Sequence, residues 1–407
     1  MALYQQYIEP GRTAEIEVLL GLVRAELTPD RIERISALVE SGAVDWTFIL
    51  HLAEKHRVWP VLYTNIKKAE LQSFLSEDVQ KVLSHQYLTI VGNNLRLCQK
   101  LTKILALFES RGIPAVPFKG PLLAQTLYED EAMRCYADLD ILVPEKRATQ
   151  ARDALLDAGF SPHVQGLSGK RFGQVLKHGR ECHFLHPSGT VAIDLHWQLG
   201  VPVRRPFDYD FCSERLQVIP WQDMNISSLS VEDTLLHLCV NGAHDQWCDL
   251  ENVLSVAEII EQYQRIDWCL VQTLAERLHC KRMLFLGLFL ARDVFDAALP
   301  PDIVDKIDID RAVEKLVRKN YRHLFREASS ENNIGTRVGR LPYYLAVREH
   351  AVDKLVYLLR RIFIPTQKDW ENRYLNPRWA GFYFLTRPID LAVELIRTLR
   401  PCRANRK

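Results

Sequence analysis

The chain of 407 residues is long enough for two or three domains. Apolar residues make up 47% of it and charged residues 25%, close to the composition of soluble globular proteins, which excludes disorder, collagen and a coiled-coil rod as descriptions of the whole chain. Because 52 lysine and arginine residues balance 51 aspartate and glutamate residues, the net charge of +1 offers no overall field for attracting nucleic acid or anionic lipid. Any polyanion site must therefore be a local patch.

Cysteine usage and the N-terminal residues predict a cytoplasmic protein. The nine cysteines are an odd number and include no C-x-x-C pair, which indicates buried thiols in a reducing compartment rather than disulfides or a zinc site. Glu9, Glu15 and Glu17 precede or interrupt the first apolar run, unlike the basic start of a secretory signal. The most apolar windows, such as 283–291, are shorter than the roughly 18 apolar residues needed to cross a bilayer, so we expect no membrane segment.

Helical periodicity begins at Thr13 and continues to about Arg111, with apolar residues at every third or fourth position. The pair Arg111-Gly112 is typical of a helix end. We therefore expect an all-helical N-terminal region over residues 1–111.

Strands and helices alternate in the next part of the chain, residues 112–225. The segments expected to form strands are 113–118, 138–143, 181–186 and 190–197. An amphipathic helix is expected at 148–158, closed by Gly159. The last two strands flank Pro187-Ser188-Gly189, which is suitable turn chemistry for a hairpin, so the sheet should be mixed rather than purely parallel.

Helical periodicity returns from about Val231 and predicts a C-terminal helical region over residues 226–407. Breaks are expected near Pro300-Pro301, Ile364-Pro365 and Asn376-Pro377. No repeat of fixed period is visible, so a solenoid is not expected. The predicted fold class is α+β, with a small mixed sheet between two helical regions.

Two aspartates stand two positions apart in the strand segment 138–143. Side chains alternate between the faces of a strand, so Asp138 and Asp140 point to one face while Leu139 and Ile141 point to the other. Adjacent like charges raise each other's pKa and destabilise a strand unless a cation, such as a hard divalent metal ion, lies between them. The pair therefore indicates a metal site; the alternative is a solvated strand face.

A second candidate is the junction Phe118-Lys119-Gly120-Pro121, where a strand ends and a helix over 122–128 begins. Free backbone N–H groups and the positive end of the helix dipole favour a phosphate beyond such a junction. Lys119 adds a mobile positive charge. The alternative is an ordinary strand-to-helix turn with an exposed lysine.

A third carboxylate stands in the strand segment 190–197. Asp194 lies among apolar residues, where a carboxylate is costly unless it is paired, metal-bound or at an open sheet edge, and His196 shares its face. Three neighbouring carboxylates are what a two-metal phosphoryl-transfer site needs. One metal activates the attacking hydroxyl, and the other holds the triphosphate and offsets charge on the leaving pyrophosphate.

A resemblance to a known family rests on five segments: Phe118-Lys119-Gly120, Tyr128, Arg134, Asp138-Leu139-Asp140-Ile141-Leu142-Val143 and Asp194-Leu195-His196-Trp197. Together they resemble the bacterial uncharacterised nucleotidyltransferase family of the DNA polymerase β-like superfamily, over about residues 110–200 and more loosely on both sides. The resemblance implies a nucleotidyltransferase core, two Mg²⁺ ions and a nucleoside triphosphate (NTP) donor. It also implies that Asp138 and Asp140 bind both metals and that Asp194 binds the metal that activates the acceptor.

The phosphate turn departs from the pattern of the wider superfamily. That pattern has Gly-Ser at the turn and a shorter stretch before the first aspartate, whereas here the turn is Lys119-Gly120-Pro121 and Asp138 follows Pro121 by 17 residues. The narrower family uses Lys-Gly, so the resemblance assigns Lys119 and Gly120 to the triphosphate. Arg134 could reach the same phosphates or pair with one of the carboxylates.

Two further groups could line the site. The basic turn Lys177-His178-Gly179-Arg180 could contact donor or acceptor, although such turns are usually solvated. Four residues of a predicted helix, at three-to-four spacing, could share a face and close the cleft, although polar capping of the helix is the simpler explanation. These are His237, Asn241, His244 and Asp245, and Trp247 lies on or just beyond the same helix.

The acceptor is left open by the sequence, and the resemblance suggests a small molecule, peptide or protein in a bacterial biosynthetic pathway. One alternative is toxin-like addition of nucleotides to tRNA, served by the basic segments 315–326 and 397–407. Another is a scaffold that binds nucleotide without chemistry and docks partners on its helical regions; a salt bridge that held Asp194 away from the other two aspartates would favour it. The sequence contains no P-loop, no Rossmann glycine fingerprint and no nucleophile elbow.

Overall fold

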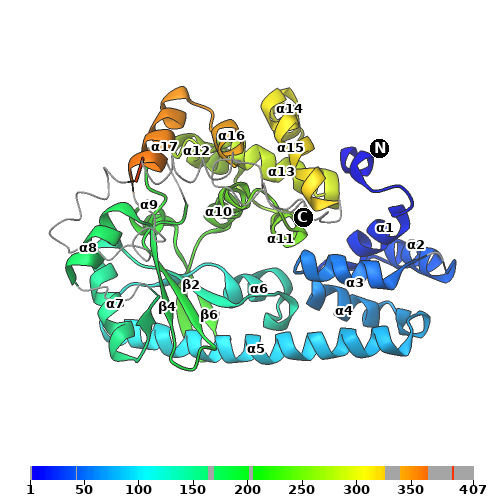
Figure 1. The fold of residues 1–407 in the computed structure, drawn as a ribbon, viewed down its shortest axis with the longest axis horizontal. Coiled ribbons are helices and arrows are strands. Elements are labelled where there is room, and N and C mark those ends of the chain that lie inside the picture. Colours follow the sequence, from blue (N-terminus) through cyan, green and yellow to red (C-terminus); the bar gives the residue numbers. More distant parts are fainter. Residues whose placement is uncertain are drawn as a thin grey trace, which may run out of the picture.

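The computed structural model of the chain describes residues 2–42, 44–163, 169–200, 205–325, 340–364 and 387–388, with the backbone alone at 169–171. A small sheet lies between the long helix α5 on one side and the C-terminal helices on the other (Figure 1). The predicted α+β class, with a mixed sheet between helical regions, is confirmed.

The N-terminal region is helical, as predicted. Its helices are α1 (Thr13–Leu22), α2 (Pro29–Glu40), α3 (Trp46–Lys55), α4 (Trp59–Lys68) and α5 (Glu77–Ser110), with 3₁₀ turns at Leu3–Tyr7 and Leu71–Phe74. Ser76 starts the 34-residue helix α5 by accepting a hydrogen bond from the N–H of Val79. The helix ends before Gly112, which has a positive φ of 63°. α5 runs beneath the whole molecule and carries the sheet on its upper side (Figure 1).

The main sheet has five strands in the order β1-β2-β5-β4-β3. Their bounds are Val116–Pro117 (β1), Asp138–Leu142 (β2), Ser161–Pro162 (β3), Glu181–Leu185 (β4) and Ala192–His196 (β5). The central strands β2 and β5 are parallel, and the other neighbours are antiparallel. β2 and β5 are therefore interior strands with a partner on each side.

Two strand features escaped the sequence analysis. β3 has only two residues, too few to give a pattern. A separate hairpin is formed by β6 (Gln217–Trp221) and β7 (Met224–Ser228). It shows weak alternation because Val218 is 72% exposed and because Pro220 interrupts the β6 run.

The helices of the sheet region are α6 (Gly120–Tyr128), α7 (Ala148–Asp157), α8 (Gly169–His178) and α9 (Tyr209–Cys212). One face of the sheet is apolar: Leu139 and Ile141 of β2, with Ile193 and Leu195 of β5, join a buried cluster with α5 and α7. Because strand side chains alternate, the polar positions of β2 and β5 lie on the opposite face, toward the C-terminal helices.

The C-terminal helices are α10 (Val231–His244), α11 (Leu250–Gln262), α12 (Trp268–Arg277), α13 (Lys281–Phe295), α14 (Pro301–Ile309), α15 (Arg311–Leu324), α16 (Leu341–Ala346) and α17 (Ala351–Phe363). The breaks expected near Pro300-Pro301 and Ile364-Pro365 are observed, and Asn376-Pro377 lies outside the described residues. These helices share one buried apolar cluster with α1–α4. The two predicted helical regions are therefore joined through a common core.

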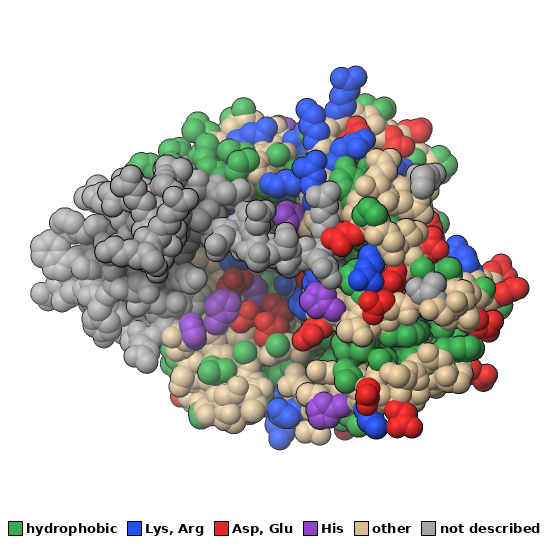
Figure 2. Space-filling view, turned by 45° about the vertical axis from the view of Figure 1, so that its right-hand side comes forward, with side chains coloured by type: hydrophobic (Ala, Val, Ile, Leu, Met, Phe, Trp, Pro, Cys, Tyr) green, Lys and Arg blue, Asp and Glu red, His purple; other side chains and the backbone are tan. Residues whose placement is uncertain are grey.

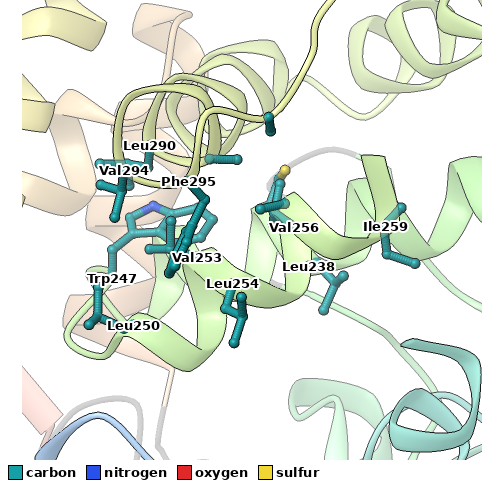
Figure 3. Close-up of a cluster of buried hydrophobic side chains, with 14 of the residues drawn as sticks. Leu238, Trp247, Leu250, Val253, Leu254, Val256, Ile259, Leu290, Val294 and Phe295 are labelled. Atoms are coloured by element: carbon teal, nitrogen blue, oxygen red, sulfur yellow. The ribbon is translucent and has the colours of Figure 1, made fainter. Parts of the chain in front are cut away.

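Trp247, just beyond α10, lies in this core. Its indole is fully buried between α11 and α13, beside Val253 and Leu290 (Figure 3). A Cβ added at Gly242 or Gly287 would lie within 2.5 to 2.9 Å of the indole ring, so the two glycines let α10 and α13 approach it closely.

The exposure of the cysteines and the length of the helices bear on two further expectations, buried thiols and the absence of a membrane segment. The eight cysteines within the described ranges are free thiols, of which five are buried, whereas Cys248 and Cys269 are exposed, contrary to the expectation of buried thiols. In the part of the chain that the structure describes, no helix is long and apolar enough to cross a membrane.

Candidate active site

Strand register brings the predicted aspartates together. β2 and β5 pair with Asp140 directly beside Asp194, and with Asp138 beside Ala192. Asp140, Asp194 and His196 each offer one potential ligand atom, and these atoms lie within 4.8 Å of one another. Figure 2 shows acidic and histidine side chains gathered in a hollow near the middle of the visible face. The three aspartates thus share one face of two adjacent parallel strands.

The position of Asp140 does not fit the alternative of a solvated strand face. Asp140 is only 8% exposed and lies in an interior strand. Its Oδ1 lies 3.0 Å from Nε2 of His196 and 3.8 Å from Nζ of Lys119. Burial raises the pKa of Asp140, but Lys119 and His196 more than offset it and hold that pKa well below its usual range. Asp140 is therefore a buried, charged carboxylate.

The ionised form of Asp138 is disfavoured by its surroundings. Burial, followed by the charges of Asp140 and Asp194, raises the pKa of Asp138 from 3.8 to about 6, and the opposing effects of Lys119 and His196 are smaller. The ionised carboxylate of Asp138 is thus unfavourable in this setting, in part because of its two acidic neighbours. A divalent cation with oxygen ligands would relieve this repulsion.

Asp194 is held by a histidine from the other neighbouring strand. His183 of β4 lies beside it in register, and Nδ1 of His183 is 2.5 Å from Oδ1 of Asp194. This hydrogen bond raises the pKa of His183 above its ordinary value. Asp194 nevertheless remains beside Asp140. A salt bridge that held Asp194 away from the other aspartates would have favoured a scaffold, and the bond to His183 does not do this.

Glu181 and His183 are site residues that the sequence analysis missed. Glu181 Oε2 lies 3.2 Å from Nδ1 of His196, and Glu181 Oε1 lies 3.9 Å from Nε2 of His183. Burial raises the pKa of Glu181, but Arg180 and the two histidines bring it down to about 2. A signal was present: the turn at 187–189 sets the hairpin register, which places alternate residues of β4 beside those of β5.

Lys119 stands at the junction where the sequence predicted a phosphate site. It is the N-cap residue of α6, which begins at Gly120, two residues earlier than expected, with Pro121 in second position. Lys119 donates a hydrogen bond of 3.1 Å from Nζ to Oδ1 of Asn241. Gly120 has a φ of 52°, and a Cβ there would lie 3.2 Å from the carbonyl oxygen of Asp138, so glycine permits this close approach. The helix N-terminus and the lysine thus lie next to the aspartates.

The end of α10 forms the opposite wall. Asn241 accepts from Lys119 and donates 3.2 Å to Oδ2 of Asp245, whose Oδ1 lies 3.1 Å from Nδ1 of His244. Burial raises the pKa of Asp245, but His244 and then Lys119 lower it below its ordinary value. His237 lies deeper, 1% exposed, with its ring edge-on to Phe118. Of the four residues predicted to close the cleft, Asn241, His244 and Asp245 are linked to one another and, through Asn241, to Lys119, and their role in closing the cleft stays a prediction.

Arg134 has a different setting from the one its motif suggested. It is buried, and its Nε donates a hydrogen bond to Oε1 of Glu251 on α11. Arg57 of the N-terminal region lies 3.4 Å from the same glutamate and 2.9 Å from Asp249. Arg134 thus joins the loop before β2 to α11. Its contact with a triphosphate stays a prediction, and that contact would require the ion pair between Arg134 and Glu251 to break.

The basic segments show mixed settings. Arg180 pairs with Glu181 at 3.3 Å, inside the site region. On α15, Arg318 pairs with Glu314 at 2.8 Å, and Lys319 lies over the ring of Tyr343. The other basic segment, 397–407, lies outside the described residues.

Replacing Asp138 by asparagine is expected to stabilise the metal-free protein. Folding raises the pKa of Asp138 from 3.8 to about 6. Below about pH 4 the carboxyl group therefore does not lower the free energy of unfolding. The loss of stability grows between pH 4 and 6 and is complete above pH 6. At pH 8 Asp138→Asn should therefore raise the free energy of unfolding by at most about 3 kcal/mol. Urea unfolding in a chelator at pH 4 and pH 8 measures the difference, which should nearly vanish at pH 4.

Asp140→Asn is the matched control with the opposite sign. Its ionised form is favoured in the folded protein, so this substitution should destabilise the protein at pH 8. Destabilisation by both substitutions at pH 8 would contradict the electrostatic description of Asp138.

Comparison with known proteins identifies a family. The family model described as uncharacterised nucleotidyltransferase matches residues 42–296, which run from the end of α2 to the first residue after α13 and cover more than half of the chain. No curated protein and no solved structure matches significantly. The matched part contains the whole sheet, the phosphate junction and α10–α13, so the family extends well beyond the motif segment 110–200. The chain belongs to the uncharacterised nucleotidyltransferase family.

Proposed function

We propose that the protein is a Mg²⁺-dependent enzyme that transfers a nucleoside monophosphate from an NTP to an acceptor hydroxyl or phosphate. The observation that supports this most is the register of β2 and β5, which places Asp138, Asp140 and Asp194 on one face. A pure scaffold has no obvious need for three carboxylates in such proximity, because their mutual repulsion is unfavourable without a cation.

The donor set fits Mg²⁺. Carboxylate oxygens are the protein ligands that Mg²⁺ prefers. The pKa of Asp138 is raised first by burial and then by the negative charges of Asp140 and Asp194, which a cation would offset. We assign Asp138 and Asp140 to both metal ions and Asp194 to the ion on the acceptor side. When bound, the two ions polarise the acceptor and the phosphates and offset charge on the leaving pyrophosphate.

The remaining residues orient the reactants. Lys119 and the N-terminus of α6 are placed to hold the triphosphate, and Asn241 keeps the lysine beside Asp140. His196 and His183 fix the carboxylates of Asp140 and Asp194 through hydrogen bonds. In the transfer, the acceptor oxygen forms a bond to the α-phosphorus and, where the acceptor is a hydroxyl, its proton passes to water. The bond from that phosphorus to the oxygen that it shares with the β-phosphorus breaks, and pyrophosphate leaves with the electron pair.

A nucleotide titration tests the donor site without knowledge of the acceptor. ATP, CTP, GTP and UTP are each added with and without Mg²⁺ to the full chain, with melting temperature and heat of binding as readouts. At least one nucleotide should stabilise the wild type only with Mg²⁺, by about 2.7 kcal/mol at a concentration of 100 Kd. The variant Asp138→Ala with Asp140→Ala should lose this response, and Asp223→Ala, an exposed carboxylate between β6 and β7, should keep it.

Two results would contradict the proposal. Stabilisation that the double variant retains would locate the nucleotide away from the aspartates. The absence of any response to the four nucleotides would contradict a donor site in this chain by itself. Nucleotide-dependent binding of tRNA that weakens steeply with salt would identify the acceptor class as RNA.

A further inference from the structure

A second group of metal-ligating side chains lies at the base of α17. His279, His350 and Asp353 each offer one ligand atom, and these atoms lie within 4.8 Å of one another. His279 stands in the turn between α12 and α13, whereas His350 is the N-cap residue of α17 and Asp353 lies in its first turn. The group therefore joins two segments that are some 70 residues apart in the sequence.

Asp353 is the independent indication of a ligand. Its side chain is 1% exposed, and one oxygen, Oδ2, lies 2.8 Å from Nδ1 of His279. The other, Oδ1, is buried with no hydrogen-bond partner among the described residues. The nearby cation Arg348 interacts with Asp353 electrostatically, but its hydrogen bond goes to the carbonyl oxygen of Tyr344 and its guanidinium lies over the ring of Tyr357. Burying an unsatisfied carboxylate oxygen costs free energy, which a bound cation would recover.

The donor types identify the class of cation. The imidazole rings of His279 and His350 lie 4.7 Å apart between centroids, and the side chain of His350 is 56% exposed, which leaves a path from solvent. Glu349 Oε2 lies 3.9 Å from Nε2 of His350. Two imidazoles and a carboxylate, with water or Glu349 as a fourth ligand, are typical of Zn²⁺ and related transition metals rather than Mg²⁺. Cysteine spacing, on which the sequence analysis relied, does not reveal a site of this kind.

We propose that His279, His350 and Asp353 bind a divalent transition metal of the Zn²⁺ class, separate from the Mg²⁺ site. The metal would fasten the start of α17 to the turn between α12 and α13. This position matters for the cleft because α17 follows α16, where the hydroxyl of Tyr344 donates 3.0 Å to the carbonyl oxygen of His244 beside the active site. Metal binding would thus hold one wall of the cleft in place.

Calorimetry with Zn²⁺ on chelator-treated full-length protein tests the proposal. The active-site group also offers metal ligands, so the titration uses a background of Asp140→Asn with Asp194→Asn. One equivalent of Zn²⁺ should bind and raise the melting temperature. Adding His350→Ala should raise the Kd for that equivalent at least about a hundredfold. The exposed helix residue His85, changed to alanine, serves as the matched control and should leave the Kd unchanged.

His350 is the residue to change because it is exposed, whereas loss of His279 would also remove the hydrogen bond of buried Asp353. Co²⁺ gives a second readout, since its visible absorption reports imidazole and carboxylate ligands directly, and His350→Ala should abolish this signal. Failure of Zn²⁺ to bind the background variant, or binding that His350→Ala does not weaken, would show that these three residues hold no metal and that His279 and Asp353 form a hydrogen-bonded pair only. Neither readout depends on nucleotide or on transfer activity.

Discussion

Replacing Asp194 by asparagine is expected to lower nucleotidyl transfer by at least about a thousandfold while leaving the Kd for NTP with Mg²⁺ within about threefold. The proposal places Asp194 on the acceptor side, whereas Asp138, Asp140 and Lys119 hold the donor. Asparagine preserves the size of the side chain and can still bond to His183, so the fold should persist. The substitution therefore separates donor binding from chemistry.

Transfer is measured as pyrophosphate released from the NTP that stabilises the protein most, with an acceptor or with water in its place. Asp223→Asn, in the exposed turn between β6 and β7, is the matched control and should retain full transfer. Transfer at the wild-type rate in Asp194→Asn would remove this residue from the mechanism. Equal loss of NTP binding would instead assign Asp194 to the donor side.

Replacing Glu251 by alanine is expected to destabilise the protein by about 3–5 kcal/mol. Glu251 is buried, accepts a hydrogen bond from Arg134 and also bonds to Ser255. Without it, the guanidinium of Arg134 is a buried charge with no carboxylate, while half-exposed Arg57 keeps Asp249. Urea unfolding at pH 7 measures the loss, and Asp157→Ala, which removes an exposed ion pair with Arg111, should cost less than about 1 kcal/mol.

Replacing both partners separates the ion pair from a role in binding nucleotide. Arg134→Met with Glu251→Leu should recover most of the stability lost in Glu251→Ala, because no buried charge is left unpaired. If Arg134 only joins the loop before β2 to α11, this double variant should bind NTP with the wild-type Kd. A Kd at least about tenfold higher would instead support the triphosphate contact that the family motif implies.

Local sequence patterns determined the order of most elements and the position of several candidate site residues within them. The alternation of side chains along a strand is a local property, so Asp138 and Asp140 could be placed on one face from the sequence alone. The same holds for Lys119 at a strand-to-helix junction and for the hairpin turn at 187–189. The sequence patterns did not predict β3 or the β6–β7 hairpin, because these strands are too short or too polar to show a regular alternation of apolar residues.

The tertiary structure alone decided which side chains meet. β2 and β5 are separated by about fifty residues, so only their parallel pairing places Asp140 beside Asp194 in the interior of the sheet rather than at its edge. The packing of α10 against the sheet supplies Asn241 to Lys119, and the packing of α11 supplies Glu251 to Arg134. These partners come from segments that are distant in the sequence. Burial of the whole core sets how such segments pack, and this packing leaves no periodic pattern in the sequence of either segment.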